Sequence, residues 1–368
     1  MHIVQCLSRS THGGAQTVVY TLVKTLCRIA PNIQHSIFLP PNGIFVERFR
    51  KLDVEVHEMP LDRLSPKTFL GMRNLLNGKN ADVIHSHGKG AGLFARTMLA
   101  SDIRSRLIHS FHGFHPPAHK FMAGVYGLAE SVLAQRTDMV ISVSAGEAEE
   151  IQNEVQSLRG KIVVIPNIVD REEVEENSTA PLEPRIVQFL SENSHCFLVA
   201  MIGRPDPLKN YPLALEASKL TVAVSDAVAF LFVGVNETHD GDSNVSKMLG
   251  GRGFTIPMLT NSASLLRRSD VLLITSKKEG SPLVVLEAFS LGKPVVGTNV
   301  IGIRDLITHR YNGFLCDDAA AISDALVKLT TDRQLYEKMS ANALKTAMKM
   351  DLQVWANSYS RTYATGVN

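Results

Sequence analysis

Short runs of β-branched and aliphatic residues alternate with longer helix-like stretches along most of this chain. The strands expected in the first half are Ile3–Leu7, Ile33–Leu39, Val54–Glu58, Asp82–His85, Leu107–Ser110, Met139–Ser142 and Ile162–Ile165. The stretches between them include Ala15–Ile29, Pro66–Leu76 and Ala145–Leu158. Since parallel strands are joined by crossovers that are usually helices, the alternation predicts an α/β fold with a parallel sheet covered on both faces.

The pattern is interrupted once and then resumes. Residues 171–181 are rich in Glu and end in Asn-Ser-Thr-Ala-Pro, a composition that favours an exposed linker. Beyond it we expect strands at Phe197–Ile202, Ala229–Val233, Val271–Thr275 and Pro294–Gly297. The helices expected there are Pro212–Lys219, Ala263–Arg268, Pro282–Leu291 and Ala319–Thr330. Two α/β halves fit a chain of 368 residues, and they predict a ligand crevice at the carboxyl ends of the strands.

The last segment carries an apolar stripe. Trp355, Tyr359 and Tyr363 are four residues apart, so they share one face of a helix. We therefore expect residues 1–168 to form an N-terminal domain and residues 169–349 a C-terminal domain. We expect residues 350–368 to form a helix that packs back on the first domain.

Composition excludes several classes of protein. Hydrophobic residues make up 45% and charged residues 20%, as in a soluble globular protein, and a net charge of +2 gives no reason to expect nucleic-acid binding. The four cysteines lie far apart, which favours free thiols over a disulfide framework. We see no signal peptide after Met1 and no apolar stretch of membrane-spanning length. We expect a cytoplasmic protein, at most attached to the inner face of the membrane.

The strongest motif is Glu279-Gly-Ser-Pro-Leu-Val-Val-Leu-Glu287, which follows the expected strand at Val271. Pro282 suits the first turn of a helix, and the free N–H groups at a helix start attract an anion such as a diphosphate. Glu287 would lie inside the helix, where its carboxylate can accept two hydroxyls of a ribose. The alternative is a capped helix with two solvated glutamates.

A basic loop, Gly203-Arg204-Pro-Asp-Pro-Leu-Lys209-Asn210, follows another expected strand. Its glycine permits a tight turn, and its two cations can clamp the same diphosphate from the opposite side. Taken alone, such a loop is more commonly explained as a solvated surface.

His12-Gly13-Gly14-Ala15 follows the first strand, and its glycines allow a ligand to approach the backbone. The segment is not GxGxxG, and no acidic residue is placed to hold a dinucleotide ribose, which argues against NAD. A plain tight turn is the alternative.

Ten of the thirteen histidines precede residue 120, which suggests a zinc site. His112-Gly-Phe-His115 lacks a cysteine or carboxylate at ligand spacing, so we expect no metal. We expect the histidines at strand ends, such as His85 and His112, to line the crevice. Asp240-Gly-Asp242 reads as an exposed turn. Two segments could touch a membrane: Phe45 to Lys51, whose Phe residues more naturally face the core, and Arg104–Lys120.

The chain resembles a retaining glycosyltransferase of the family 4 type, with the GT-B fold of two Rossmann-like domains facing each other across a cleft. The resemblance rests on the order and spacing of Gly13-Gly14, His112-Gly113, Ile165–Asp170, Gly203-Arg204 with Lys209, Glu279 with Glu287-Ala288, and Tyr311-Asn312-Gly313. It covers nearly the whole length. Departures from the family pattern are Gln16, Ile168, Leu208, Asn236, Met258, Ile301 and Arg310, and they leave the donor base open.

The resemblance implies the roles of the site residues. Arg204 and Lys209 would hold the diphosphate and stabilise the leaving nucleotide, and Glu279 would contact the transferred sugar. Glu287 would bind the ribose, and His112 would lie beside the sugar and acceptor. The remaining donor-binding residues would be Gly14, Gly203, Ser281, Leu283 and Val284, the last two through their N–H groups.

The implied reaction moves a sugar, with retention, from a nucleotide donor to a hydroxyl of a growing bacterial surface glycan. A UDP-sugar is the expected donor, a carbohydrate or lipid-linked glycan the acceptor, and a membrane surface a possible partner. No metal or other cofactor is expected. The alternatives are a sugar-nucleotide epimerase on the same fold and a non-catalytic module that binds a sugar nucleotide. The presence of all four charged residues of the site disfavours the second.

Overall fold

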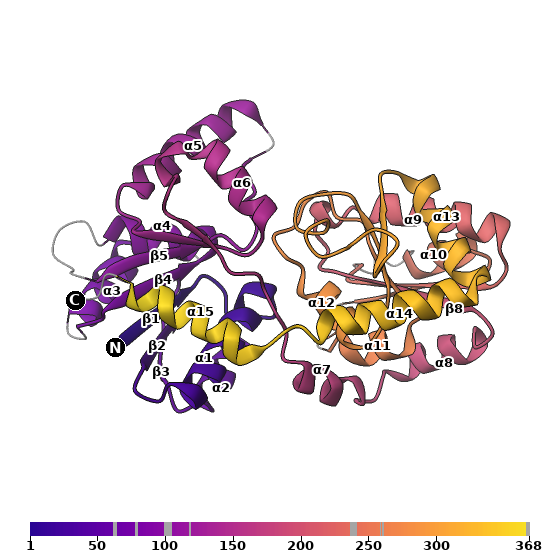
Figure 1. Ribbon diagram of the computed structural model, residues 1–368, viewed down its shortest axis with the longest axis horizontal. Helices are drawn as coiled ribbons and strands as arrows, with labels where there is room; N and C mark the ends of the chain where they lie inside the picture. The colour runs from indigo at the N-terminus through magenta and orange to yellow at the C-terminus, as the bar shows by residue number, and fades with distance from the viewer. Residues whose placement is uncertain are drawn as a thin grey trace. The chain divides into compact units, whose positions relative to one another are not determined.

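The computed structural model describes residues 1–61, 65–77, 80–98, 105–117, 119–235, 241–257, 259 and 261–365. The chain forms two compact units, shown in Figure 1. Unit 1 comprises Met1–Ile168 and Asp351–Asn368, and unit 2 comprises Val169–Met350. Both are α/β units, as the alternating pattern predicts.

Unit 1 contains a seven-stranded parallel sheet in the order β3-β2-β1-β4-β5-β6-β7. Its strands are β1 (His2–Leu7), β2 (Gln34–Leu39), β3 (Glu55–Glu58), β4 (Val83–His87), β5 (Arg106–Ser110), β6 (Met139–Ser142) and β7 (Ile162–Val164). Its helices are α1 (Gly14–Ile29), α2 (Ile44–Arg50), α3 (Pro66–Asn77), α4 (Gly88–Met98), α5 (Lys120–Ala134), α6 (Ala145–Glu154), the short η1 (Gln156–Leu158) and α15 (Leu352–Ala364).

The core of unit 1 lies on both faces of this sheet. Val4 and Cys6 of β1 pack in a cluster with residues of α3 and α4, whereas Leu7 packs with residues of α1 and α2. Phe45 and Phe49 belong to the second cluster and are fully buried, which confirms their core role and excludes them from a membrane surface. Burial on both faces explains why the strands read as nearly continuous apolar runs.

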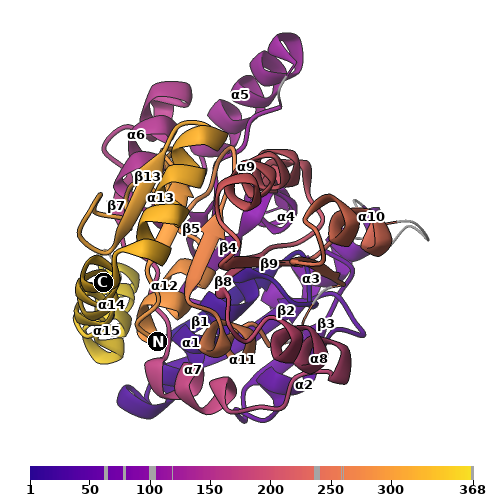
Figure 2. The same ribbon diagram turned by 90° about the vertical axis from the view of Figure 1, so that its right-hand side faces the viewer.

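Unit 2 contains a six-stranded parallel sheet in the order β10-β9-β8-β11-β12-β13. Its strands are β8 (Phe197–Ile202), β9 (Val228–Val233), β10 (Gly253–Ile256), β11 (Val271–Ile274), β12 (Val295–Thr298) and β13 (Gly313–Cys316). Its helices are α7 (Arg171–Ser178), α8 (Pro184–Glu192), η2 (Pro207–Lys209), α9 (Tyr211–Val224), α10 (Gly241–Met248), α11 (Ala263–Arg268), α12 (Leu283–Ser290), α13 (Ala319–Thr331) and α14 (Arg333–Ala347). Figure 2, turned by 90° from Figure 1, shows this unit facing the viewer.

The predicted linker is wrong, because most of residues 171–181 form α7. The Asp170 side chain caps this helix by accepting a hydrogen bond from the Glu173 N–H, and acidic residues in the first turn suit the positive end of the helix dipole. Val174 and Ser178 are buried. Arg267 pairs with Glu175, and Asn261 Nδ2 donates to the Asn177 carbonyl oxygen. The cap, the two buried residues and these two contacts together hold a helix whose composition is that of a loop.

The final helix packs on unit 1. Trp355, Tyr359 and Tyr363 of α15 are all buried, which confirms the apolar stripe. The Tyr363 hydroxyl lies 2.8 Å from His85 Nδ1 and accepts a hydrogen bond of 3.2 Å from Gln5 Nε2. Arg106 donates to the carbonyl oxygens of Thr362 and Tyr363 at the end of the helix. The helix is thus fixed both by apolar packing and by polar contacts with β1, β4 and β5.

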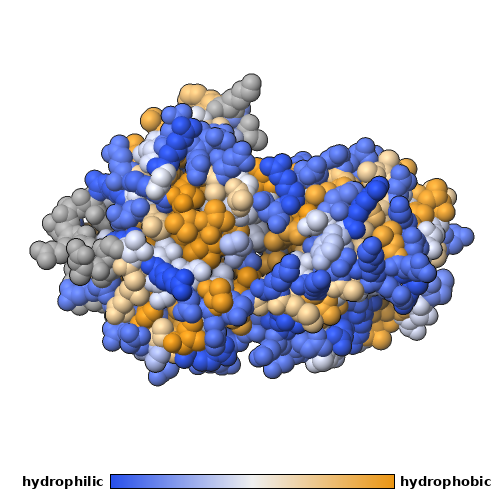
Figure 3. Space-filling view, in the orientation of Figure 1, coloured by the Kyte–Doolittle hydropathy of each residue, from blue (hydrophilic) through white to orange (hydrophobic). Residues whose placement is uncertain are grey.

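The surface carries separate hydrophobic patches among hydrophilic side chains, as Figure 3 shows for one face. No helix within the described ranges is both long and apolar enough to cross a membrane. All four cysteines are free. Asp240 of the expected Asp240-Gly-Asp242 turn lies outside the described residues, and the next two residues begin α10. Asn236 and Met258 also lie outside the described residues.

The contacts of Tyr363 give a prediction for stability. Replacing Tyr363 by Phe removes the partner of two buried groups, so the free energy of unfolding should fall by about 1–3 kcal/mol. Urea denaturation followed by circular dichroism measures this change. Tyr311→Phe in unit 2 is the matched control, and equal stability of the two variants would contradict the role of the Tyr363 hydroxyl.

Candidate functional site

The predicted donor residues of unit 2 follow two neighbouring strands. Gly203 comes directly after β8, and Glu279 and Ser281 lie in the loop after β11, which pairs with β8. The sheet continues through β9 and β10 on one side of this pair and through β12 and β13 on the other. The pair is therefore the point where the strand order reverses, the place at which open α/β sheets bind ligands.

The basic loop is tied to the end of β11. Asp206 Oδ1 accepts a hydrogen bond of 2.9 Å from the Leu208 N–H, and Asn210 turns the chain with a left-handed φ of 55°. Thr275 Oγ1 then donates to the carbonyl oxygen of Lys209 at 3.0 Å. These bonds hold the Lys209 backbone beside the loop that carries Glu279.

Lys209 and Glu279 are in direct contact. Lys209 Nζ lies 2.5 Å from Glu279 Oε1, and Ser276 Oγ donates to the same carboxylate oxygen at 2.6 Å. Both side chains are partly buried, with 21% and 14% of their surfaces exposed. An exposed ion pair contributes little to stability, but a partly desolvated cation and carboxylate side by side can bind a diphosphate and a sugar hydroxyl respectively.

Gly203 lets this lysine lie close to the strand end. A Cβ at Gly203 would lie 3.2 Å from Lys209 Cγ, tighter than ordinary packing. Gly234, at the end of β9, has a φ of +91°, and a Cβ there would lie 1.7 Å from the Gly203 carbonyl oxygen. Arg204, next in the loop, is exposed to solvent. Close backbone packing thus leaves the two cations at the surface of the strand ends.

Helix α12 begins one residue later than predicted. Pro282 is its N-cap, with the extended backbone that the residue before a helix adopts, and Leu283 and Val284 are its first two residues. Their N–H groups have no acceptor within the helix and so can bind an anion. Ser281, just before the cap, is buried.

Glu287 lies one turn further along α12. Ser262 Oγ donates a hydrogen bond of 2.6 Å to Glu287 Oε2. Burial raises the pKa of the Glu287 carboxyl, and the Ser262 hydrogen bond opposes that shift. The carboxylate is held beside α11, with one oxygen engaged by a hydroxyl, a contact of the kind that a ribose hydroxyl makes.

Sequence reasoning missed two supporting residues in unit 2. Ser262 gives no signal, since a lone serine before a short helix reads only as a cap. Gly302 has a φ of +82°, and a Cβ there would lie 2.5 Å from the Glu279 carbonyl oxygen. The turn at Gly302 therefore packs directly against the Glu279 loop. A residue with a side chain would not fit at position 302 without moving that loop.

In unit 1, Gly14 is the first residue of α1, just beyond the carboxyl end of β1. A Cβ at Gly14 would meet nothing within 4 Å, so packing inside the protein does not require glycine there. At Gly13 a Cβ would lie 2.4 Å from Gln16 Oε1. Open space in front of a helix start is compatible with close approach by a ligand.

His112 follows β5 and has a left-handed φ of 54°. The next residue, Gly113, has a φ of 115° and donates its N–H to Glu147 Oε1 at 2.6 Å. His112 Nε2 lies 2.9 Å from His87 Nδ1, while His112 Nδ1 has no hydrogen-bond partner among the described residues. The left-handed turn thus holds a histidine with one buried ring nitrogen that has no hydrogen-bond partner among the described residues.

A buried polar chain determines which nitrogen of His112 carries the proton. Gln5 donates from Nε2 to Tyr363, so its Oε1 accepts from His87 Nε2 at 2.8 Å. The Nδ1 of a neutral His87 is then an acceptor, and His112 Nε2 donates to it. The lone pair of His112 Nδ1 consequently remains to accept a hydrogen bond.

Burial keeps these histidines neutral. It lowers the pKa of His112 to about 4, and it holds the pKa values of His85, His87 and His109 well below their usual range. Within the described residues, no group of three or more potential ligands is placed to hold a metal ion. His109, Phe111 and Phe114 are also buried, so the predicted membrane contact of residues 104–120 is wrong for this part of the segment.

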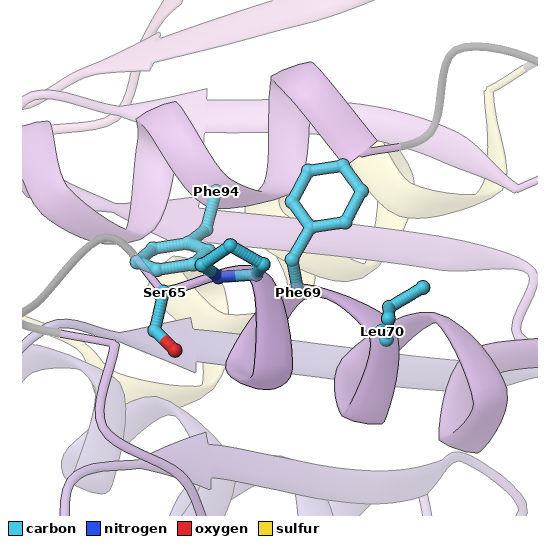
Figure 4. A pocket seen from close by; sticks show the side chains of 5 residues that line it. Ser65, Phe69, Leu70 and Phe94 are labelled. Atoms are coloured by element: carbon cyan, nitrogen blue, oxygen red, sulfur yellow. The ribbon is translucent and has the colours of Figure 1, made fainter.

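An apolar pocket of about 490 Å³ lies elsewhere in unit 1. Figure 4 shows Ser65, Phe69 and Leu70 lining it together with Phe94 of α4; Pro66 completes the lining. Its five lining residues carry no cationic side chain, so this part of the pocket does not suit a diphosphate.

Two doubly wound units with diphosphate-binding features at a switch point are typical of the GT-B class of glycosyltransferases. Family comparisons agree: the model for glycosyltransferase family 4 matches residues 12–173, and that for glycosyl transferases group 1 matches residues 183–346. The chain is 30% identical to the UDP-Gal:α-D-GlcNAc-diphosphoundecaprenol α-1,3-galactosyltransferase of Escherichia coli, over 73% of this chain and 71% of that protein. The chain belongs to the family 4 glycosyltransferases.

Solved structures confirm the GT-B fold. The crystal structure of Anabaena Alr3699/HepE in complex with UDP and glucose has a TM-score of 0.80 at 18% identity, covering 99% of this chain and 100% of that one. Sucrose-phosphate synthase from Thermosynechococcus elongatus has a TM-score of 0.77 at 17% identity, covering 99% and 98%. The predicted fold class is thus confirmed, and the final helix belongs to unit 1 as predicted.

The buried histidines give a prediction for pH. The unfolded chain binds protons at histidine near pH 6.5, whereas the folded protein excludes them, so the free energy of unfolding should fall as the pH drops below about 6.5. Urea denaturation at about pH 7 and about pH 5 measures this loss. His112→Gln should reduce the loss, because it removes one group that binds a proton only on unfolding; an unchanged slope would show that His112 titrates normally in the folded protein.

Proposed function

We propose that this enzyme transfers a hexose from a UDP-sugar to a hydroxyl of a lipid-linked bacterial glycan, with retention of configuration. The observation that carries the proposal is the convergence of Lys209, Glu279 and the start of α12 at the switch point of unit 2. The name of the E. coli relative, which specifies a UDP-galactose donor and a diphosphoundecaprenol-linked acceptor, supports the choice of donor and acceptor.

The donor diphosphate is bound from two sides. Arg204 and Lys209 provide cations, and the N–H groups of Leu283 and Val284 provide hydrogen bonds at the helix start. Glu279 then exchanges its contact with Lys209 for hydroxyls of the sugar. Glu287 exchanges Ser262 for the ribose hydroxyls, an exchange that needs little movement because its carboxylate is already positioned.

The chemical step breaks the bond between the sugar C1 and the phosphate oxygen and forms a bond from C1 to the acceptor oxygen on the same face. The acceptor proton passes to the leaving phosphate. Charge accumulates on the diphosphate during this step, and the fixed cations and N–H groups stabilise it there. No metal is needed for that role, so turnover in the presence of a chelator should be unchanged.

Unit 1 contributes His112 and Gly14. A neutral His112 would accept a hydrogen bond from a sugar or acceptor hydroxyl at Nδ1 once substrate binding exposes that buried nitrogen. The low pKa of His112 makes it a poor general base. Gly14 lets a ligand approach the backbone. We place the reaction at the inner face of the membrane, where a lipid-linked acceptor would be found.

An epimerase or a non-catalytic sensor is separated from a transferase by its products. A transferase releases UDP at a substantial rate only when acceptor is present. A sensor releases none, and an epimerase returns an altered UDP-sugar. Incubation with UDP-sugars, with and without a diphosphoundecaprenol-linked sugar, distinguishes the three.

Nucleotide binding can be tested without an acceptor. In thermal-shift measurements against UDP, GDP, ADP, CMP and NAD, we expect UDP alone to raise the melting temperature. Glu287→Ala should abolish this shift because it removes the ribose contact, while Glu216→Ala, on the exposed face of α9, should retain it. A shift by another nucleotide alone would overturn the proposed donor.

The roles of Lys209 make a kinetic prediction. Lys209→Ala should lower kcat by about 100–1,000-fold with a smaller change in donor affinity, because the leaving diphosphate gains charge in the transition state. Steady-state kinetics with UDP-sugar and acceptor measures both. Lys277→Ala, at an exposed lysine near the same loop, is the control. Normal turnover by Lys209→Ala would refute the proposed cation.

A further inference from the structure

The chain leaves β5 through two consecutive residues with a left-handed backbone. His112 has a φ of 54° and Gly113 a φ of 115°. A residue with a side chain seldom adopts this conformation, so a turn of this kind persists only where its surroundings hold it. Gly113 has no room for a side chain either, because a Cβ there would lie 2.6 Å from His115 Nε2. The position of His112 therefore depends on whatever fixes this turn.

Glu147 of α6 holds the turn from the neighbouring strand. The residue is 1% exposed, and its Oε1 accepts a hydrogen bond of 2.6 Å from the Gly113 N–H. Its Oε2 accepts a bond of 2.8 Å from the N–H of Val143, directly after β6, and lies 2.8 Å from Ser142 Oγ. One carboxylate thus joins the loops that follow β5 and β6, two strands that pair in the sheet.

The spacing of Ser144 and Glu147 also fits a simpler role. It is the spacing of a capping box, and the Ser144 side chain does cap α6 by accepting from the Glu147 N–H at 3.2 Å. A capping glutamate can act in water, however, whereas burial here raises the pKa of the Glu147 carboxyl, and the hydrogen bonds from Val143, Ser142 and Gly113 oppose that shift. The buried Gly113 N–H, which needs an acceptor, explains why the carboxylate lies inside the protein.

The backbone and the ring of His112 are held by different elements. Glu147 fixes the backbone through Gly113, and the 2.9 Å contact between His112 Nε2 and His87 Nδ1 fixes the ring. The His87 ring is bonded to Gln5 at its other nitrogen, so it could not follow a moving turn without breaking that bond. Loss of the acceptor for the Gly113 N–H would therefore reach the His112 ring.

We infer that Glu147 is a positioning residue for His112. Its carboxylate holds the left-handed turn, which keeps the His112 ring bonded to His87 through Nε2 and leaves Nδ1 as the nitrogen that can accept a hydrogen bond. The inference rests on the proposed function, which places a sugar or acceptor hydroxyl at that nitrogen. Glu147 acts through the backbone of the turn and not on the substrate itself.

Nuclear magnetic resonance of the histidine rings tests this role. In protein labelled with ¹⁵N at histidine, the Nε2 proton of His112 should give a resolved signal because its hydrogen bond slows exchange with water, and His112→Gln identifies that signal. Glu147→Met keeps the length of the side chain and removes both acceptor oxygens. We expect this variant to lose the His112 signal and to keep that of the His87 Nε2 proton, which is bonded to Gln5.

Ser144→Ala is the matched control for the stability of α6. It removes the N-cap hydroxyl and should lower the melting temperature, but it leaves the Glu147 carboxylate in place, so the His112 signal should persist. Retention of the signal in Glu147→Met would show that the turn holds without the carboxylate. Loss of the signal in both variants would show that only the stability of α6 matters. Either result overturns the positioning role.

The wild-type protein supplies a measurement that does not depend on the folding of a variant. A short hydrogen bond to a carboxylate should shift the Gly113 amide proton downfield and slow its exchange with water. A Gly113 amide that exchanges as freely as that of an exposed loop would overturn the inference, even if Glu147→Met does not fold.

UDP binding and turnover separate this role from the proposed function. Glu147→Met should keep the UDP-induced thermal shift, because the proposed donor-binding charges lie in unit 2. Its kcat with a UDP-sugar and a diphosphoundecaprenol-linked acceptor should fall by about 10–100-fold, the effect of a small misplacement near the reacting groups. An unchanged kcat beside a lost His112 signal would overturn the role of Glu147 in the reaction. A wild type that neither binds UDP nor turns over would remove the proposed function, while a His112 signal that depends on Glu147 would still support its hold on the turn.

Discussion

In unit 2, β8 pairs in parallel with β11, with Val199 opposite Val271, and the loops that follow these two strands emerge side by side. One loop carries Gly203 and Lys209, and the other carries Glu279 and leads into α12. The hydrogen bond from Thr275 to the Lys209 carbonyl and the contact between Lys209 and Glu279 both depend on this register. A slip of the pairing would separate the cation from the carboxylate and from the helix start, so the donor site is a property of the sheet as much as of its side chains.

In unit 1, the corresponding constraint is the burial of polar groups beneath the ends of the strands. Tyr363 of the final helix, Gln5 of β1 and His87 of β4 form a chain that ends at His112. Each buried group finds a partner, and the chain leaves one acceptor nitrogen over. Buried polar groups are costly unless they are paired, so the network both holds α15 on the sheet and determines the tautomer of the histidine. The same hydrogen bonds therefore affect both the stability of unit 1 and the tautomer of His112.

The buried ion pair between Arg96 of α4 and Glu130 of α5 affects the orientation of a helix more than the stability of the fold. It is fully enclosed, and such pairs add little net stability compared with apolar packing. The pair does determine the orientation of α5. The helix cannot turn its exposed apolar residues, Phe121, Val125, Leu128 and Val132, inward without separating the two charges. Unit 2 carries the proposed donor residues, and unit 1 carries His112.

The sequence by itself determined the α/β class, most strand positions and the donor motifs, because strand and helix periodicity and short loop motifs are local properties. It could not separate a linker from α7, since the burial of Val174 and Ser178 and the contacts with Asn261 and Arg267 depend on distant residues. Nor could it find Ser262 beside Glu287, or show that Lys209 touches Glu279, because these partners are 25 and 70 residues apart. The exposed apolar residues of α5 have the spacing of any core-facing helix. The buried Arg96 on α4 and the packing of Tyr126 and Ala134 decided which side of α5 faces solvent. Such long-range choices depend on which groups the fold brings together, so the tertiary structure alone settled them.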